Sequence, residues 1–341
     1  MAKSSRSHSP TMRDVATHAG VSPMTVSRTL RGDPAVSPDN RQRVLDAVTT
    51  LGYRRNEAAR SLRSGRSHGI IGLVITNLAN PFYSQLALGV EQFAATHGQQ
   101  VLIGNTAENV DRERELLADF AARRIDGAVV VPASRDHRHL RPAQLHGMPV
   151  VLAATPPRHA TLDYVLVDDF GGARKLTEQL IAGGHRRIGF LGLPAHLWTG
   201  TERRRGFTDA MNSAGLPTPA ELMDHHVGDI ATAQQVTARL LTLARPPTAL
   251  FAANNRNTMG AYRAIRQRGT ATDLVGFDDV EFADLIDQPL TVAAYDPIDV
   301  GSSAAALLYD RVTAPGRRRA RGITIPVHLR HYQVSRERAH C

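Results

Sequence analysis

The chain of 341 residues contains a single cysteine, Cys341, at its last position. No disulfide can form within such a chain, and a lone thiol is typical of proteins in a reducing compartment. No run approaches the roughly 18 apolar residues of a membrane helix, and the first residues lack the apolar stretch of a signal peptide. We therefore expect a soluble cytoplasmic protein with no membrane partner.

The sequence also lacks motifs of catalysis and cofactor binding. No Gly-x-Gly-x-x-Gly sequence follows a first strand, and no Gly-Lys-Ser/Thr phosphate loop occurs. His137 with His139, and His225 with His226, have no cysteine or carboxylate partner at metal-ligand spacing, so we interpret them as scattered surface histidines. Cys341 has no identifiable base that would make it a nucleophile. The sequence predicts no enzyme activity, no metal and no cofactor.

Positive charge is concentrated at the N-terminal end. The formal net charge is +9, and residues 1–66 hold twelve Lys or Arg against five Asp or Glu, which gives +7. The remaining residues are close to neutral. A basic segment of this kind favours a nucleic-acid partner.

Residues 11–55 predict three short helices after a disordered, Ser-rich basic tail at residues 1–10. The predicted helix starts carry capping side chains, which are Thr11 with Asp14, Ser22 followed by Pro23, and Ser37 followed by Pro38. Gly20 permits the first turn, and Gly52 ends the third helix. The expected inward-facing residues are Val15, Ala16, Ala19, Val26, Leu30, Val44, Leu45, Val48 and Leu51.

The second predicted helix carries small polar side chains and a cation on its exposed face. A three-helix bundle can be purely structural, but Thr25, Ser27 and Arg28 are short donors and a long cation. Such side chains suit base edges and phosphates in a DNA major groove. This pattern predicts a helix-turn-helix DNA-binding domain.

From about Ser67, short apolar runs alternate with amphipathic stretches. Strands are predicted at Ile70–Ile75, Val101–Gly104, Gly127–Val131, Val150–Leu152, Arg187–Leu191, Ala249–Ala252 and Leu274–Phe277, with helices at 81–97, 111–123, 201–214, 231–244 and 256–268. This alternation indicates an α/β fold with two parallel sheets covered by helices on both faces.

Polar and aromatic residues follow four of these strands. Because ligands bind beyond the carboxyl ends of the strands in open α/β sheets, these residues are candidates for a binding site. They are Asn80, Phe82, Trp198, Thr199, Arg203, Asn254 and Asp278. Aromatic rings can stack on the C–H faces of a sugar, and Asn, Arg and Asp can bind its hydroxyl groups. This combination of side chains suits a polyol or sugar. Each residue alone could cap a loop, but convergence at four strand ends favours a ligand site.

Three segments resemble the start of the LacI family of bacterial transcriptional repressors. They are Asp14-Val15-Ala16, Ala19-Gly20-Val21-Ser22 and Thr25-Val26-Ser27-Arg28. The resemblance covers nearly the whole chain, with further landmarks at Asn80–Tyr83, Gly184-His185, Arg203 with Gly206-Phe207, and Val275–Asp279. It implies an N-terminal helix-turn-helix domain and a two-lobed core like that of periplasmic binding proteins.

The resemblance assigns DNA contacts to the N-terminal region. Pro23 and Met24 would set operator preference, and Thr25 and Arg28 would contact bases or backbone. The other implied DNA-binding residues are Thr11, Ser22, Ser27, Ser37, Asn40 and Tyr53, followed by Asn56, Ala59 and Leu62 in a hinge helix. Leu62 matches the apolar wedge that this family inserts into the minor groove. Without the resemblance, residues 56–66 read as a solvated tether.

The resemblance also implies an effector pocket lined by Phe82, Arg203, Asn254 and Asp278, with Arg203 and Asp278 gripping ligand hydroxyls. Ile230 stands where some relatives carry a stacking aromatic, a role that Trp198 could fill instead. The chain departs from the family in several places: Asn40 replaces the usual Thr, Arg55 the usual Pro, Ala154 an Asp, and Asn255 the Asp of a frequent Asn-Asp pair, and the segment 269–273 looks shortened. With carboxylates lost, a less polar or negatively charged effector also fits.

The expected organisation is a tail at 1–10, a DNA-binding domain at 11–55, a hinge helix at 56–66 and an effector-binding and dimerisation core at 67–341. In the core we expect a lobe boundary near 165 and crossovers near 296 and 325. The resemblance implies a homodimeric, nucleoid-associated repressor that binds near-palindromic operator DNA under the control of a small molecule, a sugar or related metabolite. The alternative is a solute-binding module without a regulatory role.

Overall fold

The computed structural model describes residues 10–53, 68–314, 316 and 319–333. The chain divides into two units, one within residues 1–68 and the other within residues 69–341. They are called here the N-terminal unit and the core unit, and each is described by itself. No helix of the described residues is long and apolar enough to cross a membrane.

The N-terminal unit contains α1 (Met12–Ala19), α2 (Pro23–Thr29) and α3 (Pro38–Leu51). Thr11 and Asp14 form a reciprocal capping box at the start of α1. Ser22 and Ser37 cap α2 and α3 by accepting hydrogen bonds from backbone N–H groups three residues later. Gly20 ends α1 in the left-handed region at φ 63°, which lets the chain turn directly into α2. Short polar side chains thus fix where each helix begins.

The centre of the N-terminal unit is apolar and small. Its buried residues are Val15, Ala16, Ala19, Val26, Val44 and Ala47. The prediction that Leu45 faces inward is wrong, because its side chain is 44% exposed. On α3 the inward stripe runs through Val44, Ala47, Val48 and Leu51, and Leu45 lies about 100° around the helix from Val44.

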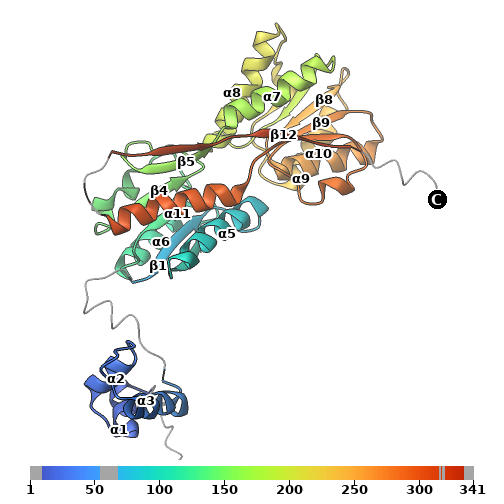
Figure 1. Ribbon diagram of the computed structural model, residues 1–341. Coiled ribbons are helices and arrows are strands. Elements are labelled where there is room, and N and C mark those ends of the chain that lie inside the picture. The colour runs from blue at the N-terminus through green and yellow to red at the C-terminus, as the bar shows by residue number, and fades with distance from the viewer. Residues whose placement is uncertain (1–9, 54–67, 315, 317–318, 334–341) are drawn as a thin grey trace, which may run out of the picture. The chain divides into compact units, whose positions relative to one another are not determined.

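The core unit is built on two six-stranded sheets (Figure 1). The first has the order β11-β5-β4-β3-β1-β2 and the second the order β12-β10-β9-β8-β6-β7. The strands of the first sheet are β1 Ile70–Ile75, β2 Gln100–Asn105, β3 Ala128–Val130, β4 Val150–Ala153, β5 Asp163–Val167 and β11 Gly322–Ile325. The strands of the second are β6 Ile188–Leu191, β7 Met223–Asp224, β8 Ala249–Ala252, β9 Asp273–Phe277, β10 Leu290–Ala294 and β12 His328–Tyr332. Every described strand pair is parallel except β10 with β12.

Helices pack on both sheets, and most of them lie in adjacent pairs. The first lobe holds α5 (Pro81–Thr96), α6 (Val110–Ala122) and α11 (Pro297–Thr313), and the second holds α7 (Asp169–Ala182), α8 (Trp198–Ser213), α9 (Ile230–Leu240) and α10 (Asn255–Arg268). Helix α11 lies beside α5, α7 beside α8, and α9 beside α10. Parallel strands covered in this way carry apolar side chains on both faces, and β3, β4, β6, β8 and β10 are buried along their whole length.

The chain passes between the lobes at three described points. It leaves the first sheet after β5, returns to the first lobe with α11 after β10, and crosses again between β11 and β12. Asp163 on β5, which is almost fully buried, holds the segments that return to the first lobe. Asp163 accepts hydrogen bonds from Arg311 Nη2 at 2.6 Å and from Arg321 Nη2 at 3.2 Å. Two late segments are thereby tied to a strand in the middle of the sequence.

Two glycines let α5 and α11 approach until their backbones touch. A Cβ on Gly89 would clash with the carbonyl of Ile298, and a Cβ on Gly301 would clash with the carbonyl of Leu86. Neither glycine needs a left-handed backbone, so the constraint is space alone. The first lobe depends on this contact because α11 enters it from the second sheet.

We expect Gly301→Ala to lower the free energy of unfolding by about 1–3 kcal/mol, since the added methyl must push backbone away from backbone. Thermal and urea unfolding of the full chain would measure the loss. Ser303→Ala, on the same helix with no side-chain hydrogen bond described, is the control and should change little. Equal stability of the two variants would contradict the close approach of these helices.

Candidate functional site

The exposed residues of α2 form the first candidate site. Pro23 is exposed, and the side chain of Met24 is 65% exposed. Thr25, Ser27 and Arg28 are half-buried, with the Thr25 hydroxyl 3.0 Å from Ser22 Oγ. Arg28 Nε donates to Asp33 at 2.8 Å, and this hydrogen bond lowers the pKa of the Asp33 carboxyl. The pair fixes the guanidinium on the loop that follows α2.

The other predicted DNA-binding residues lie around α2 at helix starts and ends. The side chains of Thr11, Ser22 and Ser37 act as caps, and the backbone N–H of Asn40 donates to Ser37 Oγ at 3.4 Å. Tyr53 packs partly buried against the apolar centre. The predicted hinge residues Asn56, Ala59 and Leu62 lie outside the described residues.

The second candidate site is a cleft between the two lobes of the core unit. It encloses about 940 Å³, open solvent at its mouth included. The predicted residues in its walls are Asn80, Phe82, Trp198, Thr199, Arg203, Asn254 and Asp278. Ile230 is not part of the lining: it starts α9, where its carbonyl packs against Gly260 of α10. Gly228 occupies the wall in that region instead.

Several wall residues were not predicted, although most follow strand ends. Thr76, Glu108, Ala154 and Tyr295 come directly or shortly after β1, β2, β4 and β10. The strand-end rule applied to all the predicted strands would have found Glu108 and Ala154, whereas Tyr295 follows β10, a strand that the sequence analysis did not predict. Ala154 adopts a left-handed φ of 60°, a conformation for which Asn and Asp are favoured over Ala. The backbone at this position would therefore accept the Asp that the family often has.

Arg203 lies at the floor of the cleft and is 3% exposed. Its Nε donates to Asp169 at 2.7 Å, its Nη1 to the carbonyl of Ala253 at 2.7 Å, and both Nη atoms donate to the Asp278 carboxylate at 3.0 and 3.2 Å. The guanidinium also stacks 3.7 Å above the centre of the Phe277 ring. Arg203 and Asp278 were predicted to grip a ligand, and here they bind each other.

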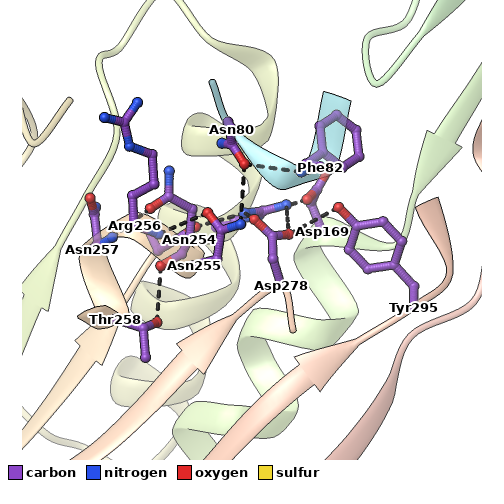
Figure 2. A network of polar contacts seen from close by, with 12 residues as sticks. Asn80, Phe82, Asp169, Asn254, Asn255, Arg256, Asn257, Thr258, Asp278 and Tyr295 are labelled. Carbon is purple, nitrogen blue, oxygen red and sulfur yellow. Dashed lines mark hydrogen bonds and ion pairs between the residues drawn. The ribbon is translucent and has the colours of Figure 1, made fainter. Parts of the chain in front are cut away.

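Burial sets the protonation of this cluster. Burial opposes the charge of Arg203, but Asp278 and Asp169 raise its pKa above the ordinary value, so it stays charged. Burial raises the pKa of Asp169 to about 6, although Arg203 works against this rise. Burial also raises the pKa of Tyr295, whose hydroxyl donates to Asp278 Oδ1 at 2.9 Å. Figure 2 shows Tyr295 and Asp278 pointing toward each other.

Polar contacts join the two lobes beside the cleft. Asn255 Nδ2 on α10 donates to Asn80 Oδ1 at the start of α5 over 3.1 Å (Figure 2). On another wall, Arg135 of the first lobe donates to Thr201 Oγ1 at 2.5 Å and to the carbonyl of His196 at 3.3 Å. An aspartate at 255 would lack the amide donor, so Asn255 has a structural use here. These bonds join the two lobes on either side of the cleft.

The start of α8 is open toward the cleft. No side chain caps this helix, whose N-cap position is Leu197, and Leu197, Trp198 and Thr199 all line the cavity. The first backbone N–H groups of α8 have no hydrogen-bond partner among the described residues. They are donors available to ligand oxygens.

The interpretation of His137 and His139 as surface residues is wrong. His137 is 1% exposed, and His139 Nε2 lies 2.7 Å from the fully buried carboxylate of Glu113. Both imidazoles hold loops of the first lobe in place through hydrogen bonds. Within the described ranges, no group of three or more His, Cys, Asp or Glu is placed to hold a metal ion.

Asp169→Asn tests the electrostatics of the floor. In the wild type, the folded state holds a proton on Asp169 up to about pH 6, whereas the unfolded chain releases it near pH 4. Stability therefore falls as pH rises through this window. In the variant this contribution is absent, so its stability relative to wild type should rise by up to about 3 kcal/mol between pH 4 and 7.

Urea unfolding at several pH values would measure this difference. The exposed Asp284→Asn variant is the control and should follow the wild type at every pH. A constant difference between Asp169→Asn and wild type across the range would show that Asp169 carries no raised pKa.

Comparisons with known proteins match both units of the chain. The family described as "Bacterial regulatory proteins, lacI family" matches residues 11–56, and "Periplasmic binding proteins and sugar binding domain of LacI family" matches residues 68–333. The chain is 33% identical over 303 residues to the HTH-type transcriptional regulator GalS of Salmonella typhimurium, covering 87% of this chain and 88% of that protein.

Two solved structures are similar over nearly the whole chain. A transcriptional regulator CelR–cellobiose complex is 28% identical with a TM-score of 0.69, covering 94% of this chain and 98% of that one. The lac repressor dimer bound to operator and the anti-inducer ONPF shares the fold with a TM-score of 0.83 at 24% identity, covering 96% of this chain and 100% of that one. The present chain therefore belongs to the LacI family of bacterial regulatory proteins and is a DNA-binding transcriptional regulator with a two-lobed ligand-binding core.

Proposed function

We propose that this regulator is a repressor whose operator affinity is set by a small polyol-bearing molecule bound in the cleft between its lobes. The observation that carries the proposal is the convergence of seven predicted side chains from both lobes on one cleft. A solute-binding module without a regulatory role does not account for the helix-turn-helix match at residues 11–56. We place the protein in the cytoplasm, on the DNA that it would regulate.

The chemistry of the cleft supports a ligand that carries hydroxyl groups. Asp278 is already bonded to Arg203 and Tyr295, so it can accept only at the edges that remain open. The uncapped start of α8 supplies donors, and the rings of Trp198 and Phe82 supply apolar faces. A sugar ring requires hydrogen-bond donors and acceptors for its hydroxyl groups and apolar surfaces for its C–H faces. The solved CelR relative is described as a complex with cellobiose.

A ligand that contacts both lobes would shift how tightly they close. The Asn80–Asn255 and Arg135–Thr201 bonds join the lobes, and a bound effector would add contacts to both sides. Coupling of this kind typically changes affinity at the second site by about 1–3 kcal/mol. In a homodimer, the change would reach two N-terminal units on half-sites about one helical turn apart.

Selection of duplexes from a random DNA library by the full chain would test the DNA side of the proposal. We expect enrichment of a near-palindromic sequence. Fluorescence anisotropy on that duplex, with a panel of mono- and disaccharides, would test the effector side. If no duplex is enriched, the repressor proposal fails regardless of any sugar result.

Met24→Ala should weaken binding to the selected operator by about 1 kcal/mol or more, roughly fivefold in Kd. Met24 is a large exposed apolar residue of α2 and would meet base edges there. Binding to an unrelated duplex should not change, because that binding depends on phosphate contacts. Leu45→Ala removes an exposed apolar side chain from α3 and is the matched control. Equal losses on both duplexes would remove Met24 from sequence recognition.

Asp278→Asn should abolish the effector response while operator affinity in the absence of effector stays within about threefold of wild type. The substitution removes the charge that aligns Arg203 at the floor of the cleft. Anisotropy titrations with and without the active saccharide would measure both quantities, and thermal unfolding would confirm that the variant folds. The exposed Glu281→Gln variant is the control. An intact response would mean that the effector binds elsewhere.

A further inference from the structure

A second, smaller pocket opens beside the cleft in the core unit. It encloses about 610 Å³ and is lined by Arg135, His137, Thr155, Pro156, Pro157, Arg158 and Trp198. Thr155 and Trp198 also line the cleft, so the two cavities share a wall. A molecule bound in the cleft against Trp198 can therefore extend into this side pocket.

The side pocket is held in shape by a buried histidine. His137 Nδ1 accepts from the backbone N–H of Arg158 at 3.0 Å, and its Nε2 bonds to the carbonyl of Ser134 at 2.9 Å. The backbone N–H of His137 also donates to the carbonyl of Arg158 at 3.3 Å. Burial lowers the pKa of His137, which keeps the ring neutral as these bonds require. The loops that carry Arg135 and Arg158 are thus joined to each other.

Glu113 also holds the loop that carries Arg135 in place. This fully buried carboxylate on α6 accepts from the backbone N–H of Ala133 at 2.7 Å and bonds to His139. The loop between Ala133 and His139 is therefore anchored at both ends, with Arg135 between the anchors. The side pocket is a preformed feature and does not depend on the position of a single flexible side chain.

Neither arginine of the side pocket, Arg135 or Arg158, is paired with a carboxylate of a described residue. The partners of Arg135 are a hydroxyl and a carbonyl, both uncharged. The guanidinium groups of Arg158 and of Arg256, which lies in the cleft wall, make no hydrogen bond or ion pair with any described residue. In Figure 2 the Arg256 side chain extends away from the polar network.

Nearby negative charges are already engaged. Asp169 and Asp278 bind Arg203 at the floor of the cleft, and Glu108 at the mouth lies 3.7 Å from His196. The guanidinium groups of Arg135 and Arg158 therefore line the side pocket with no carboxylate in its walls, whereas Arg256, in the neighbouring cleft wall, is opposed by Asp229. Arginine forks bind phosphate and carboxylate groups with paired hydrogen bonds.

We propose that the side pocket binds an anionic group of the effector, a phosphate or a carboxylate, while the uncharged part of the same molecule lies in the cleft against Trp198. The proposal rests on the proposed function and narrows its ligand to an anionic saccharide or a similar polyol acid. Arg135 and Arg158 come from the first lobe, whereas Trp198 and Arg256 come from the second. An extended anionic effector would thus contact both lobes at once.

Inorganic phosphate is the first probe, because it requires no knowledge of the sugar. Thermal unfolding of the full chain would be followed at constant ionic strength while phosphate replaces chloride. We expect saturable stabilisation of the wild type and an apparent affinity about tenfold weaker in Arg158→Ala. Arg263→Ala removes an exposed arginine that lines neither cavity and should match the wild type.

Phosphate binding by the N-terminal unit would contribute equally to all three proteins, so the comparison isolates the side pocket. Arg158 is exposed, and its side chain makes no bond with a described residue, so the variant should fold. Identical phosphate titrations of wild type and Arg158→Ala would overturn the proposal.

Glucose, glucose 6-phosphate and glucuronate are the second set of probes, used in calorimetric titrations of the full chain. We expect at least one anionic sugar to bind about tenfold more tightly than glucose, and Arg158→Ala to erase that difference. Preference for the 6-phosphate would assign a phosphate, and preference for glucuronate would assign a carboxylate. Glucose binding as tightly as both would overturn the proposal.

Measuring operator affinity with the same three sugars distinguishes the regulatory proposal from the proposal of an anionic side pocket. If an anionic sugar binds through Arg158 and leaves operator affinity unchanged, the regulatory proposal fails and the side pocket stands. If uncharged glucose alone binds and shifts operator affinity, the regulatory proposal stands and the anionic pocket fails.

Discussion

The buried guanidinium of Arg203 is the interaction on which the core unit depends. It donates hydrogen bonds to Asp169 at the start of α7, to the carbonyl of Ala253 after β8 and to the Asp278 carboxylate after β9. These bonds join three separate segments of the second lobe. Removing one partner of a buried charge pair typically costs about 3–5 kcal/mol, because the other charge stays buried without compensation. Two carboxylates share one guanidinium, so the charges of this cluster balance only below about pH 6, where Asp169 holds a proton. The remaining edges of Asp278 are what the floor offers a ligand.

The second constraint is that the first lobe is completed by segments that arrive late in the sequence. Helix α11 and strand β11 pack onto a sheet whose other strands end at residue 167, and Asp163 binds arginines from both segments. Because these connections run between the lobes, any change in lobe closure acts on the same crossings. The backbone contact at Gly89 and Gly301 makes α11 part of a stiff lobe, so movement is concentrated at the crossings themselves.

Local features were predictable from the sequence, and long-range ones were not. Caps such as Thr11, Ser22 and Ser37, and strand ends such as Asn80 and Asp278, depend on neighbouring residues and periodicity, and each lies where the pattern predicted. Strand β5 was not predicted, because the burial of Asp163 makes sense only with Arg311 and Arg321, which lie 148 and 158 residues away. His137 was misread for the same reason, since its partners belong to the backbone of another loop.

The structure shows where two departures from the family pattern, Ala154 and Asn255, lie. Ala154 lies in the cleft wall with the left-handed backbone that an Asp would favour, and Asn255 uses its amide to join the lobes. Each lost carboxylate removes a negative charge near arginines that have no carboxylate partner. At a separation of roughly 10 Å and an effective dielectric constant of about 20, one such charge is worth roughly 1.7 kcal/mol to an anion. On the proposal of an anionic effector, two neutral residues would favour an anion over an uncharged sugar in the same fold, because specificity is a difference between affinities.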